Sequence, residues 1–296
     1  SRGQLDEALR LLREEVLSAF ERLGDVRSKA VTQGRIADIL QSRGQLDEAL
    51  RIRQEEELPV YERLGDVREK AVTQGKIADI LQSRGQLDEA LRLLREEVLS
   101  AFERLGDVRS KAVTQGKIAD ILQSRGQLDE ALRLLREEVL SAFERLGDVR
   151  SKAVTQGKIA DILQSRGQLD EALRLLREEV LSAFERLGDV REKAVTQGQI
   201  ADILQSRGQL DEALRIRQEE ELPVYERLGL ERDLLVGRTN LAMALHRRGS
   251  LKDRNAIHVL LKRAYAAAKR LGLPEALRIA ELYRQIFRKP IETAKK

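Results

Sequence analysis

The segment ILQSRGQLDEAL occurs five times, and its copies begin 41 residues apart, at Ile39, Ile80, Ile121, Ile162 and Ile203. Its last nine letters, SRGQLDEAL, also open the chain at Ser1. Self-similarity at a fixed period is typical of solenoids, in which each repeat packs only on its neighbours. The repeat therefore predicts one continuous array, although a chain of 296 residues would ordinarily suggest about two domains.

The composition favours helices and excludes several classes of protein. Charged residues make up 35% of the chain and aromatic residues 3%, with four prolines, and Leu, Ala, Glu and Arg are abundant. The chain has no cysteine, which excludes disulfides, thiolate metal sites and a cysteine nucleophile and fits a reducing compartment. No apolar run approaches the roughly 20 residues needed to span a bilayer. We therefore expect an all-α, soluble, cytoplasmic protein.

One repeat, Asp25 to Gly65, contains two helical patterns. In residues 25–44 the apolar positions recur at spacings of three and four, and Arg43-Gly44 marks a helix end. Residues 45–65 begin a second apolar stripe that ends at Gly65, and the aspartate after each such glycine is placed to cap the next helix. Neither helix can bury its apolar face alone, so we expect the helix pairs to stack.

The residues Ile36-Ala37-x-x-Leu40-x-x-x-Gly44-x-Leu46-x-x-Ala49 resemble the tetratricopeptide repeat. Its usual features are a large-then-small pair on the first helix, a glycine before the second and an alanine where they cross. The unit here is longer than the usual 34 residues, Leu40 stands where an aromatic residue is common, and the terminal proline is missing. The resemblance implies a right-handed superhelical solenoid of antiparallel helix pairs, without a cofactor, that binds a protein or peptide.

Three segments are predicted along the chain: a leading second helix in residues 1–24, five near-identical repeats in 25–229, and a diverged pair with a capping helix in 230–296. The diverged pair keeps NLAMALHRRGSL, from Asn240, in register with KIADILQSRGQL, and Pro274 begins the capping helix. This last segment has 16 Lys+Arg against 6 Asp+Glu, whereas the rest of the chain has 38 against 44. It lacks interleaved aromatic residues and any nucleic-acid motif, so we interpret its charge as a solvated surface.

In the family that this chain resembles, one side of the first helix lines a concave groove. The alignment places Val31 there, and a glycine in the middle of this helix, which costs about 1 kcal/mol relative to alanine, needs a reason. Two reasons stay open: close helix packing, or room for a peptide backbone. Identical repeats favour an extended, repetitive ligand or no ligand. The predicted groove residues are Gly34, Arg35, Asp38, Gln41, Gly75, Lys76, Asp79, Gln82, Gly116, Lys117, Asp120, Gln123, Gly157, Lys158, Asp161, Gln164, Gly198, Gln199, Asp202 and Gln205.

The second helix has two variants, which we call apolar (RLLREEVLSAF, four copies) and polar (RIRQEEELPVY, two copies). The polar variant adds an Arg53–Glu57 ion pair, worth ~0.3–0.5 kcal/mol if exposed, and Pro59, which is expected to kink the helix. Two interpretations stay open: both variants fill the same layer between helices, or the apolar variant exposes a ribbon that binds a partner or a second copy. The ribbon would consist of Leu12, Val16, Leu94, Val98, Leu135, Val139, Leu176 and Val180.

Catalysis finds little support in the sequence. The two histidines, His246 and His258, lie apart in the diverged segment, and GKIAD at Gly75 lacks the other residues of a phosphate-binding loop. Adjacent glutamates such as Glu14 and Glu15 do not converge on one point, as paired catalytic carboxylates must. We therefore expect a protein that is not an enzyme and binds no metal.

Three functions remain open at this stage. The first is a protein-interaction scaffold or adaptor. The second is the sensor arm of a larger bacterial signalling protein with a nucleotide-binding switch domain, which the NLAMALHRRG and LGLPEA segments resemble and which a chain beginning in mid-repeat would fit. The third is a self-associating or designed structural array. The expected partner is a protein or peptide, with self-association as the alternative and neither a membrane nor a nucleic acid favoured.

Overall fold

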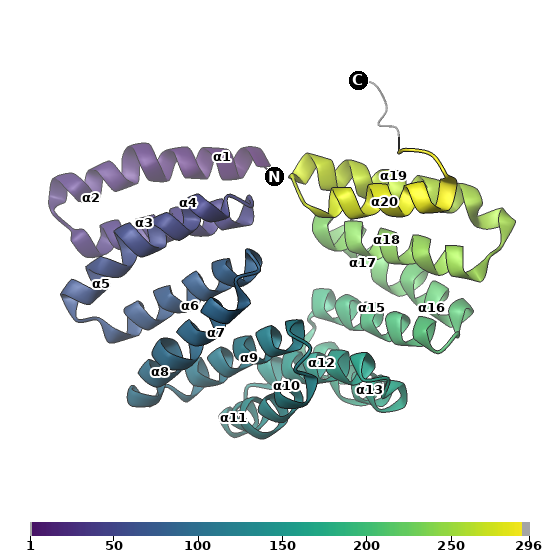
Figure 1. Cartoon of the computed structure of the whole chain (residues 1–296), viewed down its shortest axis with the longest axis horizontal. Coiled ribbons are helices and arrows are strands. Elements are labelled where there is room, and N and C mark those ends of the chain that lie inside the picture. The colour runs from purple at the N-terminus through teal and green to yellow at the C-terminus, as the bar shows by residue number, and fades with distance from the viewer. Residues whose placement is uncertain (1, 292–296) are drawn as a thin grey trace. The chain divides into compact units, whose positions relative to one another are not determined.

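The computed structural model describes residues 2–291, and it describes side chains from Leu5 onward. Within that range the regular elements are all helical, and they form two compact units, Ser1–Gly147 and Asp148–Lys296. In each unit, helix pairs follow one another as the repeat predicts (Figure 1). The predicted all-α repeat architecture is therefore confirmed, while the division at residues 24 and 229 stays a prediction.

The first unit contains a leading helix and three helix pairs, the last of which ends just before Gly147. Each second helix is interrupted by a π-helical segment, labelled η. The elements are α1 (Arg2–Leu11), η1 (Leu12–Val16), α2 (Leu17–Leu23), α3 (Val26–Ser42), α4 (Leu46–Arg51), η2 (Ile52–Glu57), α5 (Leu58–Leu64), α6 (Val67–Ser83), α7 (Leu87–Leu93), η3 (Leu94–Leu99), α8 (Ser100–Arg104), α9 (Val108–Ser124), α10 (Leu128–Leu134), η4 (Leu135–Leu140) and α11 (Ser141–Leu146).

The second unit contains two further repeats, the diverged pair α18 and α19, and the closing helix α20. Here η7 is a short 3₁₀ turn. The elements are α12 (Val149–Ser165), α13 (Leu169–Leu175), η5 (Leu176–Leu181), α14 (Ser182–Leu187), α15 (Val190–Ser206), α16 (Leu210–Ile216), η6 (Arg217–Glu221), α17 (Leu222–Leu228), α18 (Glu231–Arg248), η7 (Leu251–Asp253), α19 (Arg254–Leu271) and α20 (Glu275–Phe287).

The ends of the helices follow from local chemistry. Asp25 precedes α3, and its carboxylate accepts a hydrogen bond from the backbone N–H of Ser28 at 3.0 Å. Hydrogen bonding from Ser28 holds the pKa of the Asp25 carboxyl below its usual value. At the other end Gly44 adopts φ = 76°, a left-handed conformation that glycine takes without a steric penalty. The predicted boundaries between helices are thus confirmed.

The π-helical segments were not expected from the sequence, and they change the interpretation of Pro59. The N–H of Leu58 bonds to the carbonyl of Arg53, five residues back, as in a π-helix. In the apolar variant Ser100, which corresponds to Pro59, donates its N–H only to Glu97, three residues back. Because the α-helical ladder is already interrupted at this place in both variants, the proline replaces a weak donor and is not the cause of the irregularity.

The core of each repeat is formed by small and branched apolar residues. The alanine that we expected where the two helices cross is fully buried in all five repeats, at Ala49, Ala90, Ala131, Ala172 and Ala213. Ion pairs add links between successive repeats, for example Arg27 to Asp66 at 2.6 Å and Arg150 to Asp189 at 3.1 Å. Exposed pairs of this kind contribute about 0–1 kcal/mol each, so their role is mainly to fix the register of stacking.

The structure contradicts the exposed apolar ribbon. Leu94, Leu135 and Leu176, with Val98, Val139 and Val180, are each at most 2% exposed. Leu12 and Val16 in η1 are half-buried. The π-helical segment η3 packs against α6 of its own repeat and against α9 of the next one, and Val98 lies beside Gly75 of α6. The alternative interpretation, in which both variants fill the same layer between helices, is therefore correct.

Candidate functional site

The predicted groove residues occupy one side of each first helix, and they differ in exposure. Arg35 and Asp38 on α3 are exposed, and Gln41 is half-buried. Lysine, aspartate and glutamine at the same positions of α6, α9 and α12 are half-buried, as are Gln199, Asp202 and Gln205 on α15. The five glycines, Gly34, Gly75, Gly116, Gly157 and Gly198, are buried. The side chains therefore form a partly exposed polar row, and the glycines lie beneath it.

Most charges in this row are paired between neighbouring repeats. Lys117 on α9 lies 2.8 Å from Asp79 on α6, and it also donates to the carbonyl of Gly75 at 3.3 Å. In the second unit Gln199 donates to Asp161 at 2.8 Å. A partner that binds here must compete with these contacts for the aspartates. The row therefore offers hydrogen-bonding groups and a surface of low net charge.

In the repeats with a polar second helix, an arginine of that helix pairs with the aspartate of the polar row from inside the repeat. Arg53, which is 3% exposed, donates to Asp38 at 2.6 Å, to the carbonyl of Gly34 at 3.2 Å and to Glu57 at 2.5 Å. Arg217, which is fully buried, pairs with Asp202 and Glu221 in the same way. The Arg53–Glu57 pair is thus buried, and the small value for an exposed pair does not apply to it.

The glycines of the first helix have two different surroundings. A Cβ added to Gly34 would lie 2.6 Å from Oε1 of Glu57, and one added to Gly198 would lie 2.8 Å from Oε1 of Glu221. At Gly75 the nearest atom would be 3.8 Å away, and at Gly157 it would be 3.7 Å away, which is ordinary contact. Close packing therefore explains Gly34 and Gly198 beside the polar second helices and leaves Gly75 and Gly157 without a steric requirement.

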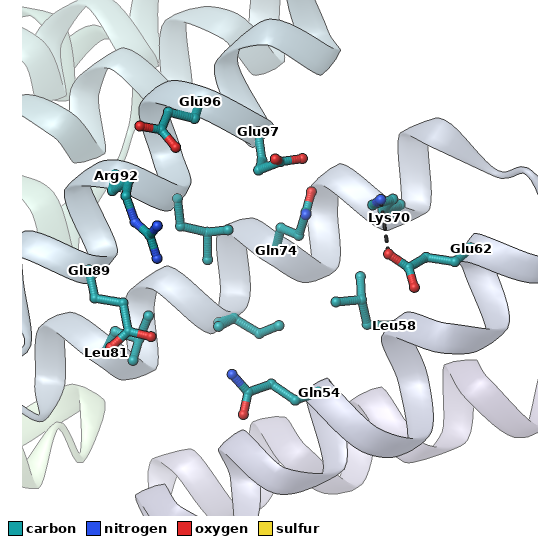
Figure 2. A pocket seen from close by; sticks show the side chains of 12 residues that line it. Gln54, Leu58, Glu62, Lys70, Gln74, Leu81, Glu89, Arg92, Glu96 and Glu97 are labelled. Atoms are coloured by element: carbon teal, nitrogen blue, oxygen red, sulfur yellow. Dashed lines mark ion pairs between the residues drawn. The ribbon is translucent and has the colours of Figure 1, made fainter.

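Two cavities lie on another part of the first unit, between successive second helices. One cavity, of about 380 Å³, is bordered by η2 and α5, by α6, and by α7 and η3 (Figure 2). The other, of about 410 Å³, lies one repeat further along. Most lining positions recur, with Leu58, Gln74, Ile77 and Leu93 in the first matching Leu99, Gln115, Ile118 and Leu134 in the second, whereas Gln54 is replaced by Arg95, which pairs with Glu130 at 2.7 Å.

The sequence analysis missed these cavities. A signal was present, because a glutamine in every TQG motif falls on the apolar stripe of the first helix. Gln33, Gln74, Gln115, Gln156 and Gln197 are all buried, and a buried amide needs hydrogen-bond partners. A polar residue repeated at a core position therefore indicates a built polar site, although the pattern does not say what that site faces.

The described residues offer no support for a catalytic or metal centre. They contain no cluster of three His, Cys, Asp or Glu side chains that could hold a metal ion. His258 lies 2.7 Å from the hydroxyl of Tyr283, within an aromatic cluster between α19 and α20. Burial lowers the pKa of His258, consistent with a neutral packing residue. Within the same range, no helix combines the length and the apolar character needed to cross a membrane.

Comparison with protein families gives a match to the tetratricopeptide repeat at residues 69–139 and 110–180. The central repeats are tetratricopeptide repeats. The resemblance predicted from Ile36 to Ala49 is thereby confirmed, with a unit of about 41 residues. A comparison with curated proteins gives no match.

Solved structures of other tetratricopeptide-like proteins are similar in fold. The TPR-like repeats of a Podosopora anserina protein named after the kinesin light chain are 25% identical, with a TM-score of 0.52, covering 67% of this chain and 95% of that one. The Rap conjugation gene regulator of plasmid pLS20, solved with the Phr* peptide, is 20% identical, with a TM-score of 0.62 and coverages of 85% and 64%. A Pyrococcus horikoshii STAND protein with a tetratricopeptide sensor is 15% identical, with a TM-score of 0.59 and coverages of 94% and 46%.

Proposed function

We propose that this tetratricopeptide array is a non-catalytic protein-interaction scaffold or adaptor, and that its partner is a protein or an extended peptide. The observation that carries the proposal is the polar row on the first helices, which places an aspartate and a glutamine at the same accessible positions in every repeat. Stacked helix pairs present such surfaces over a long distance. The Phr* complex of the pLS20 regulator shows that one protein of similar fold binds a peptide, which supports this class of partner.

The row also contains an apolar position that makes the proposal testable. Val31 on α3 and Val113 on α9 are 39% and 41% exposed, and they lie next to the predicted groove residues. An extended peptide bound along the row would contact these valines. The valines at the start of the same helices, Val26 and Val108, are 50% and 44% exposed. Val31 and Val113 come five positions later in their helices than Val26 and Val108, which places the two pairs of valines about 140° apart around the helix axis.

The test is selection of ligands from a random-peptide display library on the intact chain. We expect enriched peptides to lose binding when Val31 and Val113 are both replaced by arginine, and to keep it when Val26 and Val108 are replaced in the same way. Circular dichroism of both variants establishes that they fold. Failure to enrich any peptide, or an equal loss with the two pairs, would contradict the proposed binding surface.

Self-association stays a prediction, which light scattering over a range of concentrations would test. The sensor-arm hypothesis and a cytoplasmic location stay predictions.

A further inference from the structure

The two cavities on the second-helix side have a feature that the polar row lacks. Each is lined by the same three polar residues, a buried glutamine from the first helix and an arginine and a glutamate from the second helix. We call this set the Gln-Arg-Glu triad. In the first cavity it consists of Gln74, Arg92 and Glu97, and in the second of Gln115, Arg133 and Glu138.

Where the second helix is polar, the triad is closed on itself. Glu56 accepts hydrogen bonds from Gln33 at 2.7 Å and from Arg51 at 2.8 Å. The last polar repeat is the same, because Glu220 accepts from Gln197 at 2.6 Å and from Arg215 at 2.7 Å. In these repeats one carboxylate accepts hydrogen bonds from both the glutamine and the arginine.

In the first cavity the triad is open. The side chain of Gln74 is 7% exposed and makes no hydrogen bond with any residue that the structure describes. Arg92 and Glu97 form no ion pair within the same range, although their counterparts Arg51 and Glu56 do. Figure 2 shows the amide of Gln74 pointing into the space that these side chains surround. The amide of Gln74 thus lies on the wall of the cavity, where it is available to bond to a ligand.

The second cavity is only partly closed. Gln115 donates to Glu138 at 3.4 Å, a long contact, and Arg133 has no ion pair within the described residues. Among the positions that differ between closed and open repeats, the one directly after the arginine of the triad borders the cavity. Ile52, which follows Arg51, is 4% exposed, whereas Leu93 and Leu134 at the same position are half-buried and line the cavities.

The charges and the floor of the cavities define the chemistry of a ligand. Glu62 at the rim of the first cavity is neutralised by Lys70 at 2.9 Å. The remaining charged lining residues are Glu89, Glu96 and Glu97 against Arg92 alone. Beneath them lie Leu58, Ile77, Leu81 and Leu93, which form an apolar floor. The cavity therefore fits a side chain with a long apolar stem and a cationic head.

We propose that these two cavities bind arginine side chains of a basic peptide segment, at a surface separate from the polar row. A guanidinium group matches a carboxylate with two parallel hydrogen bonds, and its remaining N–H groups can bond to the carbonyl of a glutamine amide. Its alkyl stem covers the leucine and isoleucine side chains of the floor. Because the same cavity occurs in two successive repeats, a segment with two arginines can occupy both.

The experiment uses the intact chain and a fluorescent synthetic peptide with two arginines joined by a flexible Gly-Ser spacer. The companion peptide has citrulline, the uncharged isostere of arginine, at both positions. Fluorescence polarisation at physiological salt should show binding of the arginine peptide, and binding of the citrulline peptide should be at least tenfold weaker. Absence of binding by the arginine peptide, or equal binding of the two peptides, would overturn the proposal.

Matched variants test whether binding depends on the cavities or on a general attraction between a basic peptide and acidic residues of the protein. Glu97→Gln with Glu138→Gln should weaken binding at least tenfold, whereas Glu56→Gln with Glu220→Gln, which removes the same charge from closed triads, should leave it within about twofold. Leu93→Ile with Leu134→Ile, which copies the closed repeats and changes no charge, should also weaken binding. Equal effects of the two glutamate pairs would overturn the proposal. These variants leave Val31 and Val113 intact, so the two proposed surfaces fail or succeed independently.

Discussion

The mid-helix glycines should respond to alanine in opposite ways, depending on the variant of the neighbouring second helix. At Gly75 and Gly157 the new Cβ makes ordinary contacts at 3.7–3.8 Å, so the helix gains most of the ~1 kcal/mol by which alanine exceeds glycine. At Gly34 and Gly198 the Cβ would lie 2.6 Å and 2.8 Å from a buried glutamate oxygen. That glutamate must move away from its arginine, and the same substitution should therefore destabilise the protein.

The size of the loss can be estimated from the pair that is disturbed. Breaking a buried ion pair outright costs about 3–5 kcal/mol, and a displaced but surviving pair loses a part of that. After subtraction of the helix gain, we expect Gly34→Ala to lower the free energy of unfolding by roughly 1–2 kcal/mol. For a unit of this size a change of 1 kcal/mol shifts the melting temperature by about 2–4 °C.

The assay is thermal and urea unfolding of Gly34→Ala beside Gly75→Ala, followed by circular dichroism. Arg53→Leu with Glu57→Val supplies the control background, because it converts the neighbouring second helix to the apolar residues. In that background Gly34→Ala should stabilise the protein, as Gly75→Ala does in the natural chain. Equal stabilisation by Gly34→Ala and Gly75→Ala in the natural chain would refute the reasoning.

Three further predictions concern buried and capping charges. Arg53→Leu alone should lower the free energy of unfolding by about 3–5 kcal/mol, because Glu57 is left buried without its partner. Arg53→Leu with Glu57→Val should be neutral or stabilising in urea unfolding, and an equal loss in the two variants would contradict this. Burial raises the pKa of Glu57 and Glu221 above 4.5, so the folded protein holds protons that the unfolded chain releases. Their contribution to stability should therefore fall as pH rises above about 4.5, and urea midpoints from about pH 4 to 7 should show a smaller slope of this sign in Glu57→Gln with Glu221→Gln than in the natural protein; an unchanged slope would be evidence against it. Asp107→Ala removes the cap of α9, where the carboxylate accepts from Ser110 at 2.9 Å, and should lower stability by about 1 kcal/mol, which an unaltered melting curve would disprove.

The features that were predictable from the sequence are those that depend on residues close together in the chain. An aspartate three residues before its N–H donor caps a helix, and a glycine that adopts a positive φ ends one. Apolar residues at spacings of three and four define the buried stripe, so Ile36, Leu40 and Ala49 could be assigned to the core in advance. The repeat then supplied the stacking, because no single pair can bury its own stripe.

The π-helical segments lay outside this kind of reasoning. Leu93 and Ser100, which flank η3, have ordinary helical dihedral angles, and nothing in LREEVL indicates a π-helix, in which N–H groups bond five residues back. The same irregularity occurs beside Pro59 and without a proline, so composition alone could not locate it.

The sequence by itself determined that this chain is an array of helix pairs, where each helix begins and ends, and which alanine lies at each crossing. Only the tertiary structure decided which polar groups meet, because Lys117 and Asp79, or Gln33 and Glu56, come from different helices. Whether such a group is exposed or buried depends on the packing distance between helices. For that reason Leu94 and Val98, which read as a candidate surface, form core, and the open triad at Gln74 became visible only in the folded chain.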